Sequence, residues 1–411
     1  MPVPRMTVQP MVVVSGIGLI SPHGDDPQSV FAALMQGESA IGPIFPELPK
    51  PAAAATVAFD ETRWFTKLQL VGVDRVSQLA VAAADLALKD CGAGLDVDPE
   101  RCGVYLGCGM GGAAALEAAY TAGHQSGRVP PLTIPAFMPN APAAHVAMRH
   151  GVQGPVLTYS VACASASIAI AEAAKAIRHG EIDVAIAGGS EALIVPGVIK
   201  AWQAMQTLAT FAPGEAARAC RPFAADRNGF VLGEGAALLV LESAGRAKRR
   251  GARVYAELAG AGLSSDATHR TTPDVAGQQR AVRAALAQAD LHPADIGYCN
   301  AHGTATKVGD LIENEALAGV WGNHLEHLRV SSTKALHGHL LGATGALEAA
   351  ITVLALFKGQ LPPNAFCDVV DPACRLNLVR HNNQSANGLR AAISNSFAFG
   401  GTNSVLLFRS A

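Results

Sequence analysis

The sequence has few of the features that mark membrane-spanning, secreted or nucleic-acid-binding proteins. Only 16% of its 411 residues are charged, and a formal net charge of −2 gives no reason to expect nucleic-acid binding. No run of 18 uninterrupted apolar residues occurs, since the longest apolar window, 340–357, contains Glu348. The apolar run in the N-terminal segment is too short for a secretory signal peptide. We therefore expect a cytoplasmic protein that binds neither membrane nor nucleic acid.

Cysteine is present but does not occur in metal-binding or redox spacing. None of the eight cysteines forms a C-x-x-C pair, and an intracellular chain keeps such thiols reduced. The pattern predicts neither a disulfide framework nor a metal site, so each cysteine is judged by its neighbours. The eight are Cys91, Cys102, Cys108, Cys163, Cys220, Cys299, Cys367 and Cys374.

What the chain does have is alternation of β-rich runs with helical segments, over a length sufficient for two cores. This order predicts an α/β protein whose parallel sheet is covered by helices on both faces. Residues 43–55, 121–129 and 130–142 are expected to be irregular because they are polar or rich in proline. The expected strands are 11–20, 102–107, 156–161, 182–187, 236–241, 296–299, 329–332 and 404–408. The expected helices are 27–37, 76–91, a helix from 113, 164–180, 278–289, 311–320 and 343–358.

A short internal repeat indicates that the chain consists of two related halves. Residues 13–21 read V-V-S-G-I-G-L-I-S and residues 258–265 read L-A-G-A-G-L-S-S, each beside a β-run. We expect a first half over residues 1–252 and a second over 253–411.

One glycine motif matches the dinucleotide-binding pattern, but the residues that follow it do not. Gly107, Gly109 and Gly112 satisfy G-x-G-x-x-G after a strand, as in dinucleotide-binding proteins. The strand ending in an acidic residue that should follow about 20 residues later is missing. We expect these glycines to permit close packing, or to leave space for an elongated ligand beside Met110.

A candidate nucleophile lies where residues 156–180 change from a β-run to a helix of small residues. Cys163 falls at the turn, where free backbone N–H groups and the positive end of the helix dipole favour a thiolate. The alternative is a small buried hydrophobe, which is the commoner use of cysteine. Its position between strand and helix favours the nucleophile.

Two histidines follow strands in the second half and are candidate partners for this thiol. His302 lies in N-A-H-G-T-A-T and His339 in S-S-T-K-A-L-H-G-H-L-L-G, and both positions are typical of the ligand crevice of an open α/β sheet. His337 competes with His339, and spacing alone leaves both open. Lys334 is near enough in sequence to pair with Glu348.

A last candidate is the segment S-N-S-F-A-F-G-G-T-N at 394–403. Two adjacent glycines, Gly400 and Gly401, follow Phe399 and free the backbone to present N–H groups to a ligand. The alternative is a plain glycine turn before the final strand.

These motifs together resemble the β-ketoacyl-[acyl-carrier-protein] synthases, the synthase 2 type and related polyketide ketosynthases of the condensing-enzyme family. The match covers nearly the whole length in the family's order. It implies a thiolase-like, five-layered α-β-α-β-α fold built from two duplicated halves. It also implies a homodimer or a heterodimer with a related subunit, and no cofactor or metal of its own, because phosphopantetheine arrives on an acyl carrier protein.

The resemblance further implies a reaction, the decarboxylative Claisen condensation of an acyl thioester with malonyl-[acyl-carrier protein] in fatty-acid elongation. It favours His339 over His337. The resemblance implies that Cys163 carries the acyl group, that His302 and His339 promote decarboxylation, and that Lys334 and Glu348 support His339. It implies an oxyanion hole formed by the N–H groups of Cys163 and Phe399. It also implies that the phosphopantetheine arm or the acyl chain contacts Thr304, Thr306, Met110 and Gly400, and that Asp310 and Glu313 brace the site.

Several positions depart from the family's usual residues. Lys307 replaces a common proline, Ala398 stands before Phe399, and the segment 65–75 keeps Lys67 and Arg75 but adds apolar residues where a carrier protein is expected to dock. The altered 65–75 segment, together with Met110 where the family often has a branched aliphatic residue, favours a dedicated polyketide or polyene pathway as the alternative.

Two further alternatives are opposed by single residues. A non-catalytic chain-length partner subunit would lack a nucleophile, whereas this chain has Cys163. A degradative thiolase would have a second cysteine near the C-terminus, where this chain has Phe399 and glycines.

Overall fold

The computed structural model of the protein describes residues 10–92 and 96–411. Within these residues, eleven strands form one mixed sheet in the order β12-β11-β10-β13-β14-β9-β1-β8-β6-β4-β5, and β2, β3 and β7 form a small second sheet. The strands are β1 Val12–Ile20, β2 Ile41–Ile44, β3 Ala52–Ala55, β4 Cys102–Gly107, β5 Val156–Tyr159, β6 Val184–Glu191, β7 Leu232–Gly233, β8 Gly235–Ser243, β9 Ala256–Ser265, β10 Tyr298–Asn300, β11 Arg329–Ser331, β12 Asn377–Leu378, β13 Ala391–Phe397 and β14 Thr402–Arg409.

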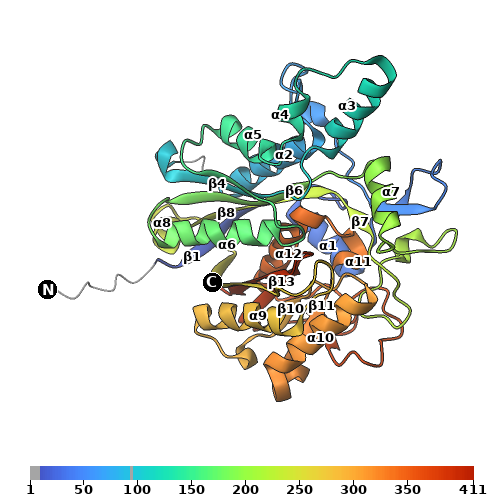
Figure 1. Ribbon diagram of the computed structural model, residues 1–411. Coiled ribbons are helices and arrows are strands. Elements are labelled where there is room, and N and C mark those ends of the chain that lie inside the picture. Colours follow the sequence, from blue (N-terminus) through green and yellow to red (C-terminus); the bar gives the residue numbers. More distant parts are fainter. Residues whose placement is uncertain (1–9, 93–95) are drawn as a thin grey trace.

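The helices stack in three layers around the two halves of this sheet (Figure 1). Helices α2 and α5 cover one outer face, α9 and α10 cover the other, and α6 and α12 lie between the two halves, where they share one apolar cluster. The result is a five-layered α-β-α-β-α arrangement. The helices are α1 Pro27–Gln36, α2 Arg75–Asp90, α3 Ala113–Ser126, α4 Thr133–Phe137, α5 Ala141–His150, α6 Ser165–Arg178, α7 Pro196–Ala204, α8 Ala244–Arg249, α9 Val275–Ala289, α10 Lys307–Trp321, α11 Lys334–His337 and α12 Thr344–Lys358.

The two halves repeat one topology. Numbered in chain order, the first half has strands β1, β4, β5, β6 and β8, and the second has β9, β10, β11, β13 and β14. In both halves the strands lie side by side in the order 3-2-4-5-1. Strands 3, 2 and 4 run parallel to one another, whereas strand 5 pairs antiparallel with both strand 4 and strand 1. The halves meet where β1 and β9 pair over only two residues each.

The internal repeat in the sequence has a packing cause. A Cβ atom at Gly18 in β1 would lie 2.0 Å from the carbonyl oxygen of Ala83 in α2, and one at Gly262 in β9 would lie 1.8 Å from that of Ala281 in α9. Each G-x-G segment therefore lets the first strand of a half contact its outer helix directly.

The prediction of a parallel sheet is wrong for the central strands. β8, β1, β9 and β14 run antiparallel to their neighbours, and only the outer strands of each half are parallel. All nine residues of β1 are buried, so an antiparallel strand covered on both faces has the continuous apolar run that is typical of parallel strands.

Three segments expected to be irregular contain regular structure. Residues 43–55 contribute to β2 and β3, α3 continues to Ser126, and 130–142 contains α4 and the start of α5. The prolines of α4 and α5 lie in the first turn of each helix, where no N–H donor is required.

One helical segment of the described chain, Leu341–Lys358, is long and apolar enough to cross a membrane. In the fold, 89% of it is buried, because α12 lies between the two halves of the sheet. Its apolar character therefore comes from its place in the core.

Candidate active site

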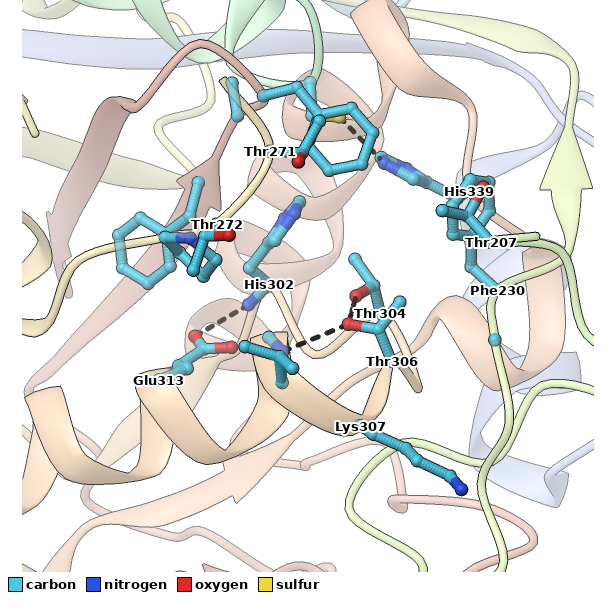
Figure 2. A pocket seen from close by; sticks show the side chains of 18 of the residues that line it. Thr207, Phe230, Thr271, Thr272, His302, Thr304, Thr306, Lys307, Glu313 and His339 are labelled. Atoms are coloured by element: carbon cyan, nitrogen blue, oxygen red, sulfur yellow. Dashed lines mark hydrogen bonds between the residues drawn. The ribbon is translucent and has the colours of Figure 1, made fainter. Parts of the chain in front are cut away.

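The three residues predicted to carry the chemistry line one cavity of about 490 Å³. Its wall includes Cys163 from the turn after β5, His302 from the loop after β10, and His339 from the loop after β11. Figure 2 shows the two imidazoles directed into the same space from different loops, with Thr304 and Thr306 beside them. The carboxyl ends of parallel strands thus bring together residues that are far apart in sequence.

A strained turn presents Cys163 at the start of α6. The preceding residue, Ala162, has φ of +45°, a conformation that costs free energy for a residue with a Cβ atom. The Ser165 hydroxyl donates to the Ala162 carbonyl oxygen at 2.7 Å and accepts from the Val161 N–H at 2.8 Å. These two hydrogen bonds hold the turn and so fix the direction of the thiol.

His339 lies against the thiol. Its Nε2 is 3.0 Å from Cys163 Sγ, and its Nδ1 is 2.8 Å from the hydroxyl oxygen of Thr344, the first residue of α12. His302 lies edge-on to His339, with ring centroids 5.5 Å apart. One donor atom from each of Cys163, His302 and His339 lies within 4.8 Å of the others, a set that could also hold a soft divalent ion such as Zn²⁺.

Burial disfavours the charged form of these three groups. It raises the pKa of the Cys163 thiol to about 12, although the nearby Lys334 charge and hydrogen bonds from the N–H groups of Phe399 and Cys163 lower it. Burial, followed by the Lys334 charge, holds the pKa of both His302 and His339 well below the ordinary value. Burial therefore opposes both the thiolate of Cys163 and the imidazolium forms of the two histidines, and the direction of the Cys163–His339 hydrogen bond depends on the tautomer of His339.

Lys334 and Glu348 form a fully buried ion pair, with Nζ 2.5 Å from Oε1. The pairing predicted from the sequence is present. Burial raises the pKa of Glu348 to about 7, and the Lys334 charge opposes that rise. The pair lies behind the cavity wall, so Lys334 acts on the imidazoles through its charge.

Two carboxylates of α10 hold segments around the site: Glu313 holds the His302 loop, and Asp310 holds the segment that contains Phe223 and Arg227. Glu313 accepts hydrogen bonds from the N–H groups of His302 and Gly303, at 2.9 and 2.7 Å. Asp310 accepts from the Phe223 N–H at 2.8 Å and pairs with the buried Arg227 at 3.3 Å. Burial raises the pKa of both carboxyls, that of Asp310 to about 7.

Two hydroxyls line the cavity below the histidines. The hydroxyl oxygens of Thr304 and Thr306 are 3.0 Å apart, and the Thr306 hydroxyl also caps α10 by accepting a hydrogen bond from the Gly309 N–H. Lys307, the next residue, points away from the histidines in Figure 2.

Comparison with known proteins agrees with this geometry. The family profile for the beta-ketoacyl synthase N-terminal domain matches residues 9–247, and that for the C-terminal domain matches residues 255–368. The chain belongs to the beta-ketoacyl synthase family.

Relatives of this family member carry several names. Nodulation protein E of Rhizobium sp. (strain N33) is 43% identical over 405 residues, covering 97% of this chain and 98% of that protein. The 3-oxoacyl-[acyl-carrier-protein] synthase 2 of Staphylococcus aureus (strain COL) is 37% identical over 415 residues, covering 98% and 99%. The solved structure of the ishigamide ketosynthase/chain length factor aligns with a TM-score of 0.92 at 31% identity, over 98% of this chain and all of that one.

Two predicted substrate-binding residues of this beta-ketoacyl synthase do not line the cavity. Met110 lies at the surface with 45% of its area exposed. The N–H of Gly400 donates to the Arg270 carbonyl oxygen at 2.8 Å, so it is not free for a ligand. Phe399 and Gly401 line the cavity instead.

Arg75 was expected to remain available for a carrier protein. Its Nε donates to Glu234 at 3.0 Å, and its Nη2 donates to Glu234 at 2.8 Å and to the Val57 carbonyl oxygen at 2.7 Å. Lys67 is exposed. The 65–75 segment therefore presents less positive charge than its sequence indicates.

Spacing alone left His337 open, the family resemblance favoured His339, and neither pointed to several neighbours of His339. The His337 imidazole is bound on both sides, to the Gly338 carbonyl oxygen and the Thr333 hydroxyl, which leaves no nitrogen for a substrate. Thr344 and Phe230, whose ring is 5.5 Å from that of His339, lacked any distinguishing local motif.

Proposed function

We propose that this protein catalyses the decarboxylative Claisen condensation of an acyl thioester with malonyl-[acyl-carrier protein], giving a 3-oxoacyl-[acyl-carrier protein] in fatty-acid elongation. The observation that carries the proposal is the convergence of Cys163, His302 and His339 on one cavity. The reaction requires a nucleophile for the acyl group and two places for developing negative charge. Phosphopantetheine would arrive on the carrier protein, and no other cofactor or metal is required.

In the first half-reaction, Cys163 Sγ attacks the acyl thioester carbonyl while its proton moves to His339 Nε2. The carbonyl oxygen receives hydrogen bonds from the N–H groups of Cys163 and Phe399, the two that now bind the sulfur. The tetrahedral species collapses, the carrier thiolate leaves and takes the proton, and the acyl group remains on Cys163.

In the second half-reaction, malonyl loses CO₂, and the thioester oxygen becomes an enolate oxygen. The neutral imidazoles of His302 and His339 donate N–H hydrogen bonds to it. The enolate carbon then attacks the acyl carbonyl and releases the Cys163 thiolate. The Thr344 hydroxyl suits both stages, because it accepts from Nδ1–H of His339 in one tautomer and donates to Nδ1 in the other.

A second copy, or a related subunit, is the expected partner along the edge strand β5. Val156 and Leu157 are 38% and 44% exposed there, and Leu132, Ile134 and Met138, in and beside α4, are also exposed. A free edge with apolar side chains is unfavourable in water. The mass of the protein in solution tests the dimer, and a monomer would contradict it.

A second candidate is the same condensation in a dedicated polyketide or polyene pathway. It is supported by the names of two similar proteins, nodulation protein E and the ishigamide ketosynthase/chain length factor, which do not refer to fatty-acid elongation. The two candidates differ in the acyl chain and in the carrier protein. They share the chemistry of Cys163.

Intact-mass measurement of acyl groups loaded from a panel of carrier-bound donors tests the function and separates the candidates. Saturated donors should load if the chain elongates fatty acids, and polyunsaturated donors should load preferentially if it serves a dedicated pathway. Cys163→Ala should show no acyl adduct and no condensation. Condensation by that variant would exclude the proposed nucleophile.

A further inference from the structure

Glu191 is a buried carboxylate that the proposed chemistry does not use. It is the last residue of β6, its exposed fraction is zero, and within the part of the chain that the structure describes no cation pairs with it. Burial raises its pKa to about 7 despite three hydrogen bonds that lower it. A buried carboxylate without a counter-ion is costly, so its surroundings should give it a specific task.

Three backbone N–H groups from two loops bind Glu191. Oε2 accepts from Gly109 at 2.8 Å and from Gly342 at 2.9 Å, and Oε1 accepts from Met110 at 3.2 Å. Gly109 and Met110 follow β4 in the first half, whereas Gly342 lies just before α12 in the second. One side chain thus joins a loop of each half.

Both loops are shaped to reach this carboxylate. A Cβ atom at Gly109 or at Gly342 would lie 2.6 Å from Glu191 Oε2, and one at Gly342 would also lie 2.3 Å from the Gly109 nitrogen. Only glycine at both positions lets the two N–H groups share one oxygen.

The turn that Glu191 holds carries His339 and the residue that orients it. Gly342 lies between His339 and Thr344, whose side chains are hydrogen-bonded to each other at 2.8 Å. The intervening Leu341 has φ of +42° and lines the cavity, so this turn is strained and needs an external contact. On the other side, the Gly109 carbonyl oxygen accepts from Ser160, three residues before Cys163.

We propose that Glu191 is a positioning residue that fixes the His339 turn against the Gly109–Met110 loop and thereby sets the contact between His339 and Cys163. The inference rests on the proposed role of Cys163. A carboxylate suits the task because its two oxygens accept all three N–H groups, whereas a glutamine has one acceptor oxygen and would direct its NH₂ group at another donor.

The test is the rate at which iodoacetamide alkylates Cys163, followed by intact mass in the wild type, Glu191→Gln and Gly342→Ala. Alkylation needs the thiol and its base but no thioester, so it reports the Cys163–His339 contact even if no acyl donor loads. A displacement of about 1 Å slows reactions by roughly 100-fold, and we expect both variants to react 10- to 100-fold more slowly. Gly342→Ala separates the loops without altering Glu191.

Charge and position predict opposite results for Glu191→Gln. The negative charge of Glu191 raises the pKa of Cys163, so removing the charge alone should speed alkylation. Slower alkylation therefore supports positioning, and an equal or faster rate overturns it.

Glu242→Gln is the matched control. Glu242 is also fully buried, but it lies on β8 and is held by Arg246 and Arg250 away from the cavity. This variant should lose thermal stability while alkylation of Cys163 stays within twofold of the wild type. Equal slowing in Glu242→Gln and Glu191→Gln would reduce Glu191 to a general structural role and overturn the proposal.

Discussion

The two halves of the molecule share one strand order, but their equivalent loops carry different functional residues. The loop between the third strand and its following helix carries Cys163 in the first half, and the corresponding loop carries Lys334 and His339 in the second. The loop after the second strand carries Gly109 and Met110 in one half and His302 in the other.

This difference shows how a duplicated scaffold becomes a single site. The helices that follow the two third-strand loops, α6 and α12, pack against each other at the centre of the molecule (Figure 1). Equivalent loops therefore face each other, and Cys163 meets His339 at 3.0 Å. Duplication supplies the meeting point, and the two halves have divided the nucleophile and the bases between them.

The largest predicted effect separates the halves chemically. Cys163→Gln should lose condensation but still release CO₂ from malonyl-[acyl-carrier protein], because both imidazoles of the second half remain. His302→Ala should lose about 100-fold or more of that release, since one donor to the enolate is gone. Measurement of CO₂ from both variants checks the division, and the reverse result would show that the roles are assigned wrongly.

The sequence could predict those site residues that a short stretch of neighbouring residues marks out. Cys163, His302 and His339 each follow a strand and stand beside small residues, so their loops were identifiable, as was the G-x-G repeat of the two halves. The burial that raises the pKa of Cys163 was not predictable, because Phe230 and Leu341, which help to bury it, come from distant parts of the chain.

Antiparallel pairing and the task of Glu191 had no local signal either. Strand β1 is buried on both faces, and this removes the alternation that distinguishes an antiparallel strand. The donors to Glu191 lie about 80 and 150 residues away in sequence. Both features depend on contacts that only the folded chain makes.

A smaller effect concerns the buried ion pair of the second half. Lys334→Met leaves Glu348 unpaired and should destabilise the fold by about 3–5 kcal/mol, measured by urea unfolding. Lys334→Met with Glu348→Leu should recover most of that stability but not decarboxylation. If the double variant decarboxylated malonyl normally, the Lys334 charge would have no part in the site.

The loss in Lys334→Met should depend on pH. The folded-state pKa of Glu348 is raised to about 7, and removing the cation that opposes this rise raises it further. A raised carboxyl pKa means that the folded state holds its proton more tightly than the unfolded state, so stability falls as pH increases from about 4.5 upward. The variant should be closer to the wild type at pH 5 than at pH 8, and a constant difference would contradict this linkage.

The smallest predicted effect tests the likeness of the halves. Gly18→Ala and Gly262→Ala each place a methyl group within about 2 Å of a helix carbonyl oxygen, so each should lose about 1–3 kcal/mol through forced separation of strand and helix. Gly42→Ala, with open space around its Cβ position, is the control and should change stability by less than about 1 kcal/mol. Similar losses in the first two variants would mean that both halves depend on the same strand–helix contact. Tolerance of Gly262→Ala with unfolding of Gly18→Ala would mean that the second half has room to relax, although it retains the topology of the first.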